Sequence, residues 1–279
     1  MKKVVFCTWG TVPFCHLIKV CDCSFFPACA KGDCPQLYNQ AIKKVNLRTG
    51  VVYMQGLRES IYSNLLNEDR WLMLTDGFVN TIKVSLWSIL LATLLGGILC
   101  AIRMKSRNWL RGSVRLYVDL MRAIPLLVLL LLLFYVILAD TSLSPLWIAI
   151  VCFTLYFSAY FCEIFRSGIE GVDRGQWEAG LALGLNAWRT FIKVIMPQAL
   201  KKIIPVYKGQ MITLVKSTSI IGYVAVVDLT KAGDLIRSRT FDAFFPLLLV
   251  AAVYLLLTVL LGALLDLLER RITPKSRKI

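Results

Sequence analysis

IPLLVLLLLLFYVIL, residues 124–138, is a run of fifteen residues without a charge. With its flanks it reads as one membrane span over 116–139, in which Pro125 can kink the helix, and about 20 apolar residues suffice to cross a bilayer. The chain is 57% hydrophobic with a mean hydropathy of +0.67, more apolar than a soluble domain of average composition. The sequence therefore predicts an all-α membrane protein with five transmembrane helices, at about 78–102, 116–139, 146–164, 203–224 and 244–268.

Positive charges occupy alternate connections between these runs. The net charge of +15 would favour nucleic-acid binding in a soluble chain. Lys and Arg number five in 103–115, six in 166–202 and five after 268, against zero in 140–145 and three in 225–243. Basic residues collect on the cytoplasmic side of membrane proteins. We therefore expect a cytoplasmic C-terminus and long loop, an external N-terminus, surrounding membrane lipids and no nucleic-acid partner.

The long loop between the third and fourth runs contains EAGLALGLNAWRTFIKVIMPQAL, residues 178–200. An exposed apolar segment of this kind usually marks an interaction site. Good helix formers occupy 176–185, and Glu178 lies near the N-terminal end, where a negative charge suits the helix dipole. The segment therefore predicts a cytoplasmic helix that docks into a groove on a partner.

Small residues, and residues that cap or break helices, predict the shape of this loop. We expect Ala179 and Gly184 to keep one face of the docking helix slim. Asn186 is a suitable cap for a second helix that starts near Ala187. Pro197 is expected to break this second helix before the fourth run.

The spacing of residues in the loop carries a resemblance. It resembles the EAA loop of bacterial ABC-importer permeases, whose pattern is E-A-A, three residues, G, nine residues and I-x-L-P. The matching positions are Glu178-Ala179-Gly180, then Gly184, then Val194-Ile195-Met196-Pro197. Gly180, Val194 and Met196 depart from the pattern but preserve small size or apolar character.

Three further stretches resemble the branch of permeases for polar amino acids, of the histidine, glutamine or arginine type. Residues 121–138 resemble its R-G-T-P-L-L-V segment, with Ala123-Ile124 in place of Gly-Thr. Residues 197–221 resemble its P-Q-A and K-x-T-S-L series, and 228–244 its acid-L-T-x-A-G segment. The resemblance covers about residues 73–272.

The resemblance implies a type I ABC-importer permease in the bacterial inner membrane. Its coupling loop, about 167–202, would dock on separate ATPase subunits that bind ATP and Mg. The implied partners also include a second permease copy or a sister permease, an extracytoplasmic solute-binding protein and a polar amino acid. The residues implied in coupling are Gln176, Trp177, Glu178, Ala179, Gly180, Leu181, Ala182, Leu183, Gly184, Leu185 and Pro197.

Catalytic signatures are missing from the sequence. It has no G-x-x-x-x-G-K-[ST] phosphate loop and no G-x-S-x-G. His16 is its single histidine, which excludes H-E-x-x-H. We therefore expect a non-catalytic transport subunit with no cofactor and no metal site of its own.

Polar residues within the predicted helices are candidates for a substrate path, because charges inside a bilayer are costly. They are Lys216, Ser217, Thr218, Ser219 and Tyr160. Lys216 could meet a carboxylate of the substrate, or it could reach the interface or pair with Asp228. Asp119 and Arg122 are expected to pair on one helix face, and Glu163 with Arg166 to form structural ion pairs or contacts to the ATPase.

Residues 1–72 form a predicted Cys-rich extension, external or disordered, before the permease domain at 73–272 and a basic cytoplasmic tail at 273–279. Six cysteines lie within its first 34 residues, a number that permits disulfides in an oxidising compartment. Two alternatives remain open at this point. One is an ABC permease for another small solute, and the other is a membrane anchor or sensor whose N-terminus binds metal or protein.

Overall fold

The computed structural model describes residues 62–105 and 108–272, and the regular elements in this part of the chain are helices. They begin with η3 (Tyr62–Leu66), η4 (Asn67–Asp69) and α2 (Arg70–Lys105). The remaining elements are α3 (Asn108–Ala123), α4 (Leu126–Leu132), η5 (Leu133–Ile137), α5 (Pro145–Glu170), α6 (Arg174–Ala182), α7 (Ala187–Thr190), η6 (Phe191–Ile195), α8 (Met196–Ser217), η7 (Thr218–Val224), α9 (Leu229–Thr240) and α10 (Phe244–Ile272).

Three helices in the described part are each long and apolar enough to cross a membrane: α2, α5 and the segment Phe244–Leu267 of α10. Two bent helix pairs also qualify if each pair counts as one span, which gives up to five. The predicted all-α membrane fold is confirmed, whereas the count of five spans stays a prediction.

The segment predicted as a span over 116–139 is broken in the structure at Pro125, where the sequence predicts a possible kink. Helix α3 ends at Ala123, and the pair of Asn108–Ala123 with Leu126–Ile137 is bent by 105°. Pro125 lies at the break with φ −60° and ψ 136°, an extended conformation. Proline has no N–H to donate and pushes the preceding residue out of the helical region. The proline thus predicts the place of the break, whereas hydropathy does not predict the size of the change in backbone direction.

The helix that begins near Ala187 does not end at Pro197, so that prediction is wrong. A helical path runs from Ala187 through the π-helical turn η6 into α8 and the 3-10 turn η7, and bends by 52° before α9. Pro197 lies in the first turn of α8, where a missing N–H is tolerated. Pro205 lies inside α8, and Pro246 lies in the first turn of α10, where it marks the start of a span.

Helices α2 and α5 pack closely against each other along their lengths. A Cβ atom on Gly96 would lie 2.8 Å from Cβ of Phe161 and 2.9 Å from the carbonyl oxygen of Ser158. The main core cluster includes Phe153, Phe157 and Phe161, all essentially inaccessible. Helix α8 packs against α5, and α10 packs against α8 and α9. The bundle is therefore centred on α5, with most of α10 exposed.

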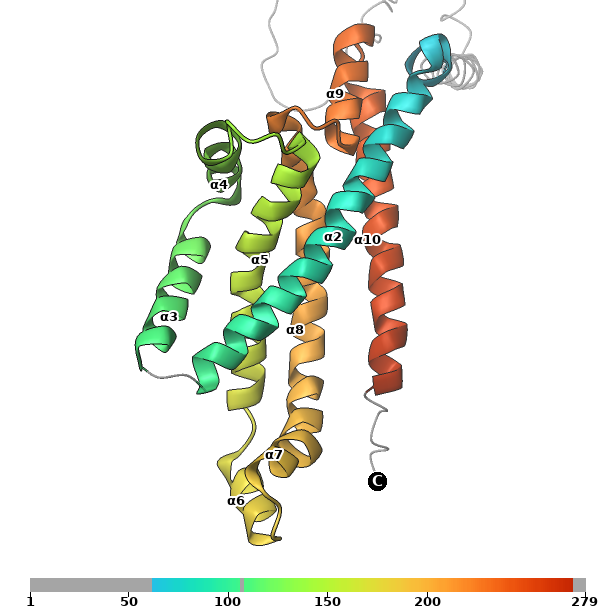
Figure 1. Cartoon of the computed structure of the whole chain (residues 1–279). Coiled ribbons are helices and arrows are strands. Elements are labelled where there is room, and N and C mark those ends of the chain that lie inside the picture. Colours follow the sequence, from blue (N-terminus) through green and yellow to red (C-terminus); the bar gives the residue numbers. More distant parts are fainter. Residues whose placement is uncertain (1–61, 106–107, 273–279) are drawn as a thin grey trace, which may run out of the picture. The chain divides into compact units, whose positions relative to one another are not determined.

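The described helices end at two opposite ends of the bundle (Figure 1). Helices α6 and α7 lie at the end where α2 and α10 finish, and α9 lies at the other end. Helix α9 begins at a cap formed by Asp228, which is fully buried and accepts from the backbone N–H groups of Thr230 and Lys231. Contacts to α2 hold this start of the helix in place: the amide of Asn80 donates to the carbonyl of Val227 at 3.0 Å. The hydroxyl of Thr81 also accepts from the N–H of Leu229 at 3.2 Å.

Candidate functional site

Helix α6 has well-defined ends. Asp173 caps its N-terminus by accepting from the N–H of Gly175 at 2.6 Å. At its other end the N–H of Gly184 donates to the carbonyl of Leu181 at 2.9 Å, and the N–H of Leu185 donates to that of Gly180 at 3.2 Å. These two bonds form a Schellman motif, in which the residue at the Gly184 position is left-handed.

Gly184 has φ +79° and open space around its Cα. The expectation that it keeps a helix face slim is therefore wrong. Its conformation is one that glycine adopts without steric cost, and the residue ends the helix. The predicted cap at Asn186 is confirmed, because its Oδ1 atom accepts from the N–H of Arg189 at 2.8 Å and α7 begins at Ala187.

Most of the residues expected to couple to an ATPase are exposed. Leu183 is 80% exposed and Leu181 44% exposed. Trp188 of α7, which sequence reasoning missed, is 68% exposed and stacks on Phe191. It could have been found as a large aromatic residue in a cytoplasmic loop. The exposed members of the predicted set are Gln176, Glu178, Ala179, Leu181, Ala182, Leu183, Gly184 and Pro197, while Trp177 and Leu185 are half-buried and Gly180 is buried.

Helix α6 is attached to the rest of the loop along one face. Trp177 packs against the small core cluster formed by Val172, Ile195, Ala199 and Ile203. The Nε2 atom of Gln198 donates to Oε1 of Gln176 at 3.0 Å. Gly180 contacts Thr190 of α7. Leu181, Leu183 and, on α7, Trp188 are left exposed by the described residues.

The base of the loop is held between α5 and α8. The ammonium group of Lys202 donates to the carbonyl of Gly171, just beyond the end of α5. A Cβ atom on Gly168 would lie 2.2 Å from Cγ1 of Ile203, so the two helices touch here. These contacts join the start and the end of the loop that carries α6.

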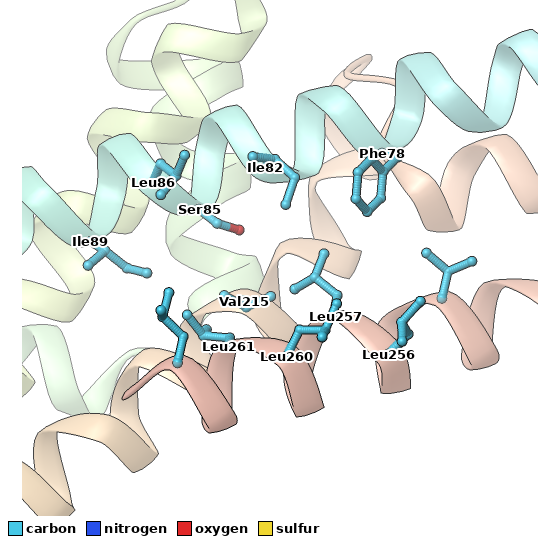
Figure 2. Close-up of a pocket in the computed structure, with 12 residues that line it drawn as sticks. Phe78, Ile82, Ser85, Leu86, Ile89, Val215, Leu256, Leu257, Leu260 and Leu261 are labelled. Carbon is cyan, nitrogen blue, oxygen red and sulfur yellow. The ribbon is translucent and has the colours of Figure 1, made fainter. Parts of the chain in front are cut away.

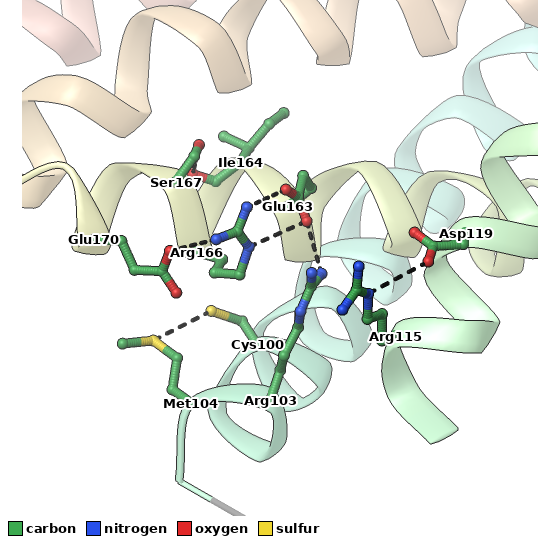
Figure 3. Close-up of polar contacts among 10 residues, drawn as sticks. All are labelled: Cys100, Arg103, Met104, Arg115, Asp119, Glu163, Ile164, Arg166, Ser167 and Glu170. Atoms are coloured by element: carbon green, nitrogen blue, oxygen red, sulfur yellow. Dashed lines mark hydrogen bonds and ion pairs between the residues drawn. The ribbon is translucent and has the colours of Figure 1, made fainter. Parts of the chain in front are cut away.

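A half-buried charged cluster lies near the same end of the bundle (Figure 3). Nη1 of Arg103 lies 2.7 Å from Oε2 of Glu163, and Arg166 bonds both Glu163 and Glu170. The side chains of Arg103 and Glu163 are 16% and 25% exposed. These charges satisfy one another, which is the structural ion pairing expected from the sequence.

The predicted pair of Asp119 with Arg122 is wrong. Asp119 pairs with Arg115 one turn earlier, at 3.7 Å (Figure 3). Arg122 instead lies over the ring of Tyr160, with its Cζ atom 5.5 Å from the ring centre. Arg122 is the penultimate residue of α3, and the break that follows the helix lets it approach α5.

Tyr160 belongs to a polar group between α3 and α5. Its hydroxyl lies 3.1 Å from that of Tyr156, and the Arg122 guanidinium covers its ring face. Sequence reasoning selected Tyr160 but missed Arg122 as its neighbour, although Arg122 lies in the stretch 121–138 that carries the family resemblance. The group offers one cation and two hydroxyls within a small volume.

The four adjacent candidates on α8 and η7 do not form one polar group. Thr218 is fully buried and donates to the carbonyl of Val215, while Ser217 donates to that of Thr213. Ser219 is half-buried and Lys216 is exposed. No described residue forms an ion pair with Lys216, since Asp228 is occupied by its own helix cap.

An apolar groove runs between α2 and α10 (Figure 2). Its volume is about 310 Å³, and its walls are leucines of α10 with residues of α2 and Val215 of α8. Ser85 is the polar side chain of this lining. A groove with this lining offers almost no hydrogen bonds, so it does not suit a polar solute.

The fold and the projecting loop are those of an integral membrane transport component. The family model described as "Binding-protein-dependent transport system inner membrane component" matches residues 93–274. The chain belongs to this family, and it is a permease subunit of an ABC importer.

Relatives and solved structures support this assignment. The L-cystine transport system permease protein TcyB of Bacillus subtilis is 33% identical, with 75% of this chain and 90% of that protein covered. The probable glutamine ABC transporter permease protein GlnM of the same organism is 35% identical, with 73% and 95% covered. The crystal structure of an amino acid ABC transporter with histidines matches with a TM-score of 0.66 and 31% identity, over 71% of this chain and 94% of that one.

Proposed function

We propose that this chain forms the translocation path of an importer for polar amino acids and that the apolar surface of α6 and α7 docks on a separate ATPase. The surface comprises Leu181, Leu183 and Trp188. It supports the proposal because it is exposed and projects from the bundle on a helix pair held by α5 and α8. Burial of apolar area of this kind stabilises complexes.

The orientation follows from charge. The end of the bundle that carries α6 also carries Arg103 and Lys105 at the end of α2, together with the C-terminal end of α10. The excess of basic residues favours this end as the cytoplasmic one. The C-terminus would then be cytoplasmic and the start of α2 external, where a solute-binding protein would deliver substrate.

The partners complete the transporter. Two ATPase subunits would bind ATP and Mg, and a second copy of this chain or a sister permease would form the other half of the path. Closure of the ATPases would move α6, and the contacts at Gly171 and Ile203 would pass that movement to α5 and α8. Coupling of this kind requires two states with different contacts for each partner.

Polar amino acids are the best-supported substrate class. Relatives named for cystine and glutamine, and a solved transporter bound to histidines, favour this class. Within the chain, the guanidinium of Arg122 suits a carboxylate, and the hydroxyls of Tyr156 and Tyr160 can hydrogen-bond to polar groups. Lys216 is a second available cation.

Reconstitution provides the test. The chain would be placed in liposomes with its ATPase and binding protein, and ATP-driven uptake of a panel of amino acids would be measured. Leu183→Asp should abolish uptake and capture of the ATPase, because it places a charge in the docking surface. Leu143→Asp is the matched control, since Leu143 is 46% exposed in the loop before α5. Normal ATPase capture by Leu183→Asp would refute the docking proposal.

A further inference from the structure

Gly180 is the buried residue of α6, and it faces Thr190 of α7 at very short range. A Cβ atom on Gly180 would lie 2.4 Å from Cγ2 of Thr190, 3.0 Å from its Oγ1 and 3.2 Å from its Cβ. Contacts of 2.4 Å between carbon atoms do not occur in folded proteins, because optimal separations are about 3.5–4.0 Å. The two helices therefore approach as closely as they do only because residue 180 has no side chain.

Thr190 cannot move aside by rotating. Its two γ atoms occupy two of the three staggered positions, and these two positions are the ones that face Gly180. Each rotamer fills two of the three positions, so at least one facing position stays occupied. Thr190 is fully buried, and its N–H bonds the carbonyl of Asn186 at 2.9 Å. An added methyl group at 180 must therefore force α6 and α7 apart.

The Thr190 hydroxyl makes no hydrogen bond to any described residue. Its removal therefore breaks no hydrogen bond that the structure shows. Other attachments of α6 to the loop are the packing of Trp177 and the hydrogen bond from the side-chain amide of Gln198 to that of Gln176. Since these two lie toward the start of the helix, the contact at Gly180 sets how closely the exposed end of α6, with Leu181 and Leu183, lies against α7.

We propose that Gly180 and Thr190 form a matched pair that sets the position of α6 against α7, and through it the amount of substrate moved for each ATP hydrolysed. This inference rests on the proposed docking of α6 on an ATPase. It accounts for glycine in place of the second alanine of the E-A-A pattern, because Thr190 fills the volume that an alanine methyl group would need. Both residues are positioning residues and touch neither substrate nor nucleotide.

The test compares four variants of the chain, reconstituted with its ATPase and binding protein: Gly180→Ala, Thr190→Ala, the double variant, and Gly209→Ala. Gly209 lies in α8 with nothing within 4 Å of a built Cβ, so it controls for the change from glycine to alanine. Uptake and ATP hydrolysis are measured in the same vesicles, and their ratio is the readout. The amount of inserted protein is measured for each variant.

Gly180→Ala should lower the number of substrate molecules moved per ATP by about tenfold, with normal insertion. The double variant should return this ratio to within about twofold of the original chain, because the Thr190 γ atoms are gone. Thr190→Ala alone and Gly209→Ala should stay close to the original ratio. Rescue by the second substitution is the result that a simple loss of folding would not give.

Two failures are distinguishable. If the original chain shows no ATP-driven uptake, the proposed function fails. The matched pair is overturned, while the transport function stands, if the original chain transports and Gly180→Ala moves as much substrate per ATP as the original chain. It is also overturned if adding Thr190→Ala to Gly180→Ala does not restore the amount of substrate moved per ATP.

Discussion

The guanidinium of Arg103 lies 2.7 Å from a carboxylate oxygen of Glu163 and so joins the C-terminal end of α2 to α5. Glu163 also accepts from Arg166, which reaches Glu170 at the last turn of α5. The next residue, Gly171, accepts from Lys202 of α8. Three membrane helices are thus connected by polar contacts at the base of the coupling loop.

Glu163→Gln should destabilise the protein by about 1–2 kcal/mol, less than the loss expected for a fully buried pair because these side chains are partly exposed. Neutralising Glu163 leaves Arg103 and Arg166 close together without their shared counter-charge. Thermal unfolding in detergent measures the effect. Asp119→Asn is the control, since Asp119 and Arg115 are 60% and 72% exposed, and it should change stability by less than about 0.5 kcal/mol.

Gly184→Ala should impair coupling although it meets no neighbour. A non-glycine residue at φ +79° costs about 1 kcal/mol or more, which favours a different end for α6. Gly184→Asn should retain more activity, because asparagine tolerates the left-handed region better. ATP-driven uptake by the two variants measures the difference, and equal uptake would show that the Schellman motif does not matter for coupling.

Asp228→Ala should destabilise the N-terminal end of α9. The carboxylate is fully buried and caps α9, and loss of a cap costs about 1–2 kcal/mol. Limited proteolysis near residues 225–228 and thermal unfolding would report the change. Asp234→Ala serves as the matched control on the same helix, because Asp234 is 42% exposed and pairs with Arg237. A stability loss as large for Asp234→Ala would contradict this explanation.

Arg122→Ala should raise the substrate concentration for half-maximal uptake by about tenfold, with a smaller effect on the maximal rate. Arg122→Lys should recover little, because lysine lacks the planar group that stacks on Tyr160. Lys216→Ala in the same assay tests the second cation and is expected to have the smaller effect. An unchanged half-saturating concentration for Arg122→Ala would remove Arg122 from the substrate site.

The sequence predicts those features that depend on short stretches. Apolar runs locate α2, α5 and α10, and an asparagine before a helical segment locates the start of α7. Contacts between residues that are distant in sequence cannot be predicted in this way. The contact of Gly180 with Thr190 and the position of Arg122 over the ring of Tyr160 are seen only in the folded structure. Pro125 indicates a kink in the second apolar run, but the size of the bend, 105°, cannot be predicted from the proline or from the surrounding leucines. The six cysteines of the first 34 residues lie outside the described residues, and their predicted roles stay predictions.

The π-helical turn η6 (Phe191–Ile195) has a consequence for chain length. Such a turn contains one more residue than an α-helical turn, and each residue contributes about 100° of rotation. A single deletion within η6 would convert the wide turn into an α-helical one and leave α6 and α7 pointing in nearly the same direction, whereas a deletion within α8 would rotate them about the axis of α8 by about that angle. After a deletion in α8 the apolar surface would point away from a docked ATPase, so this helical path should tolerate the loss of a residue in η6 far better than the loss of one in α8.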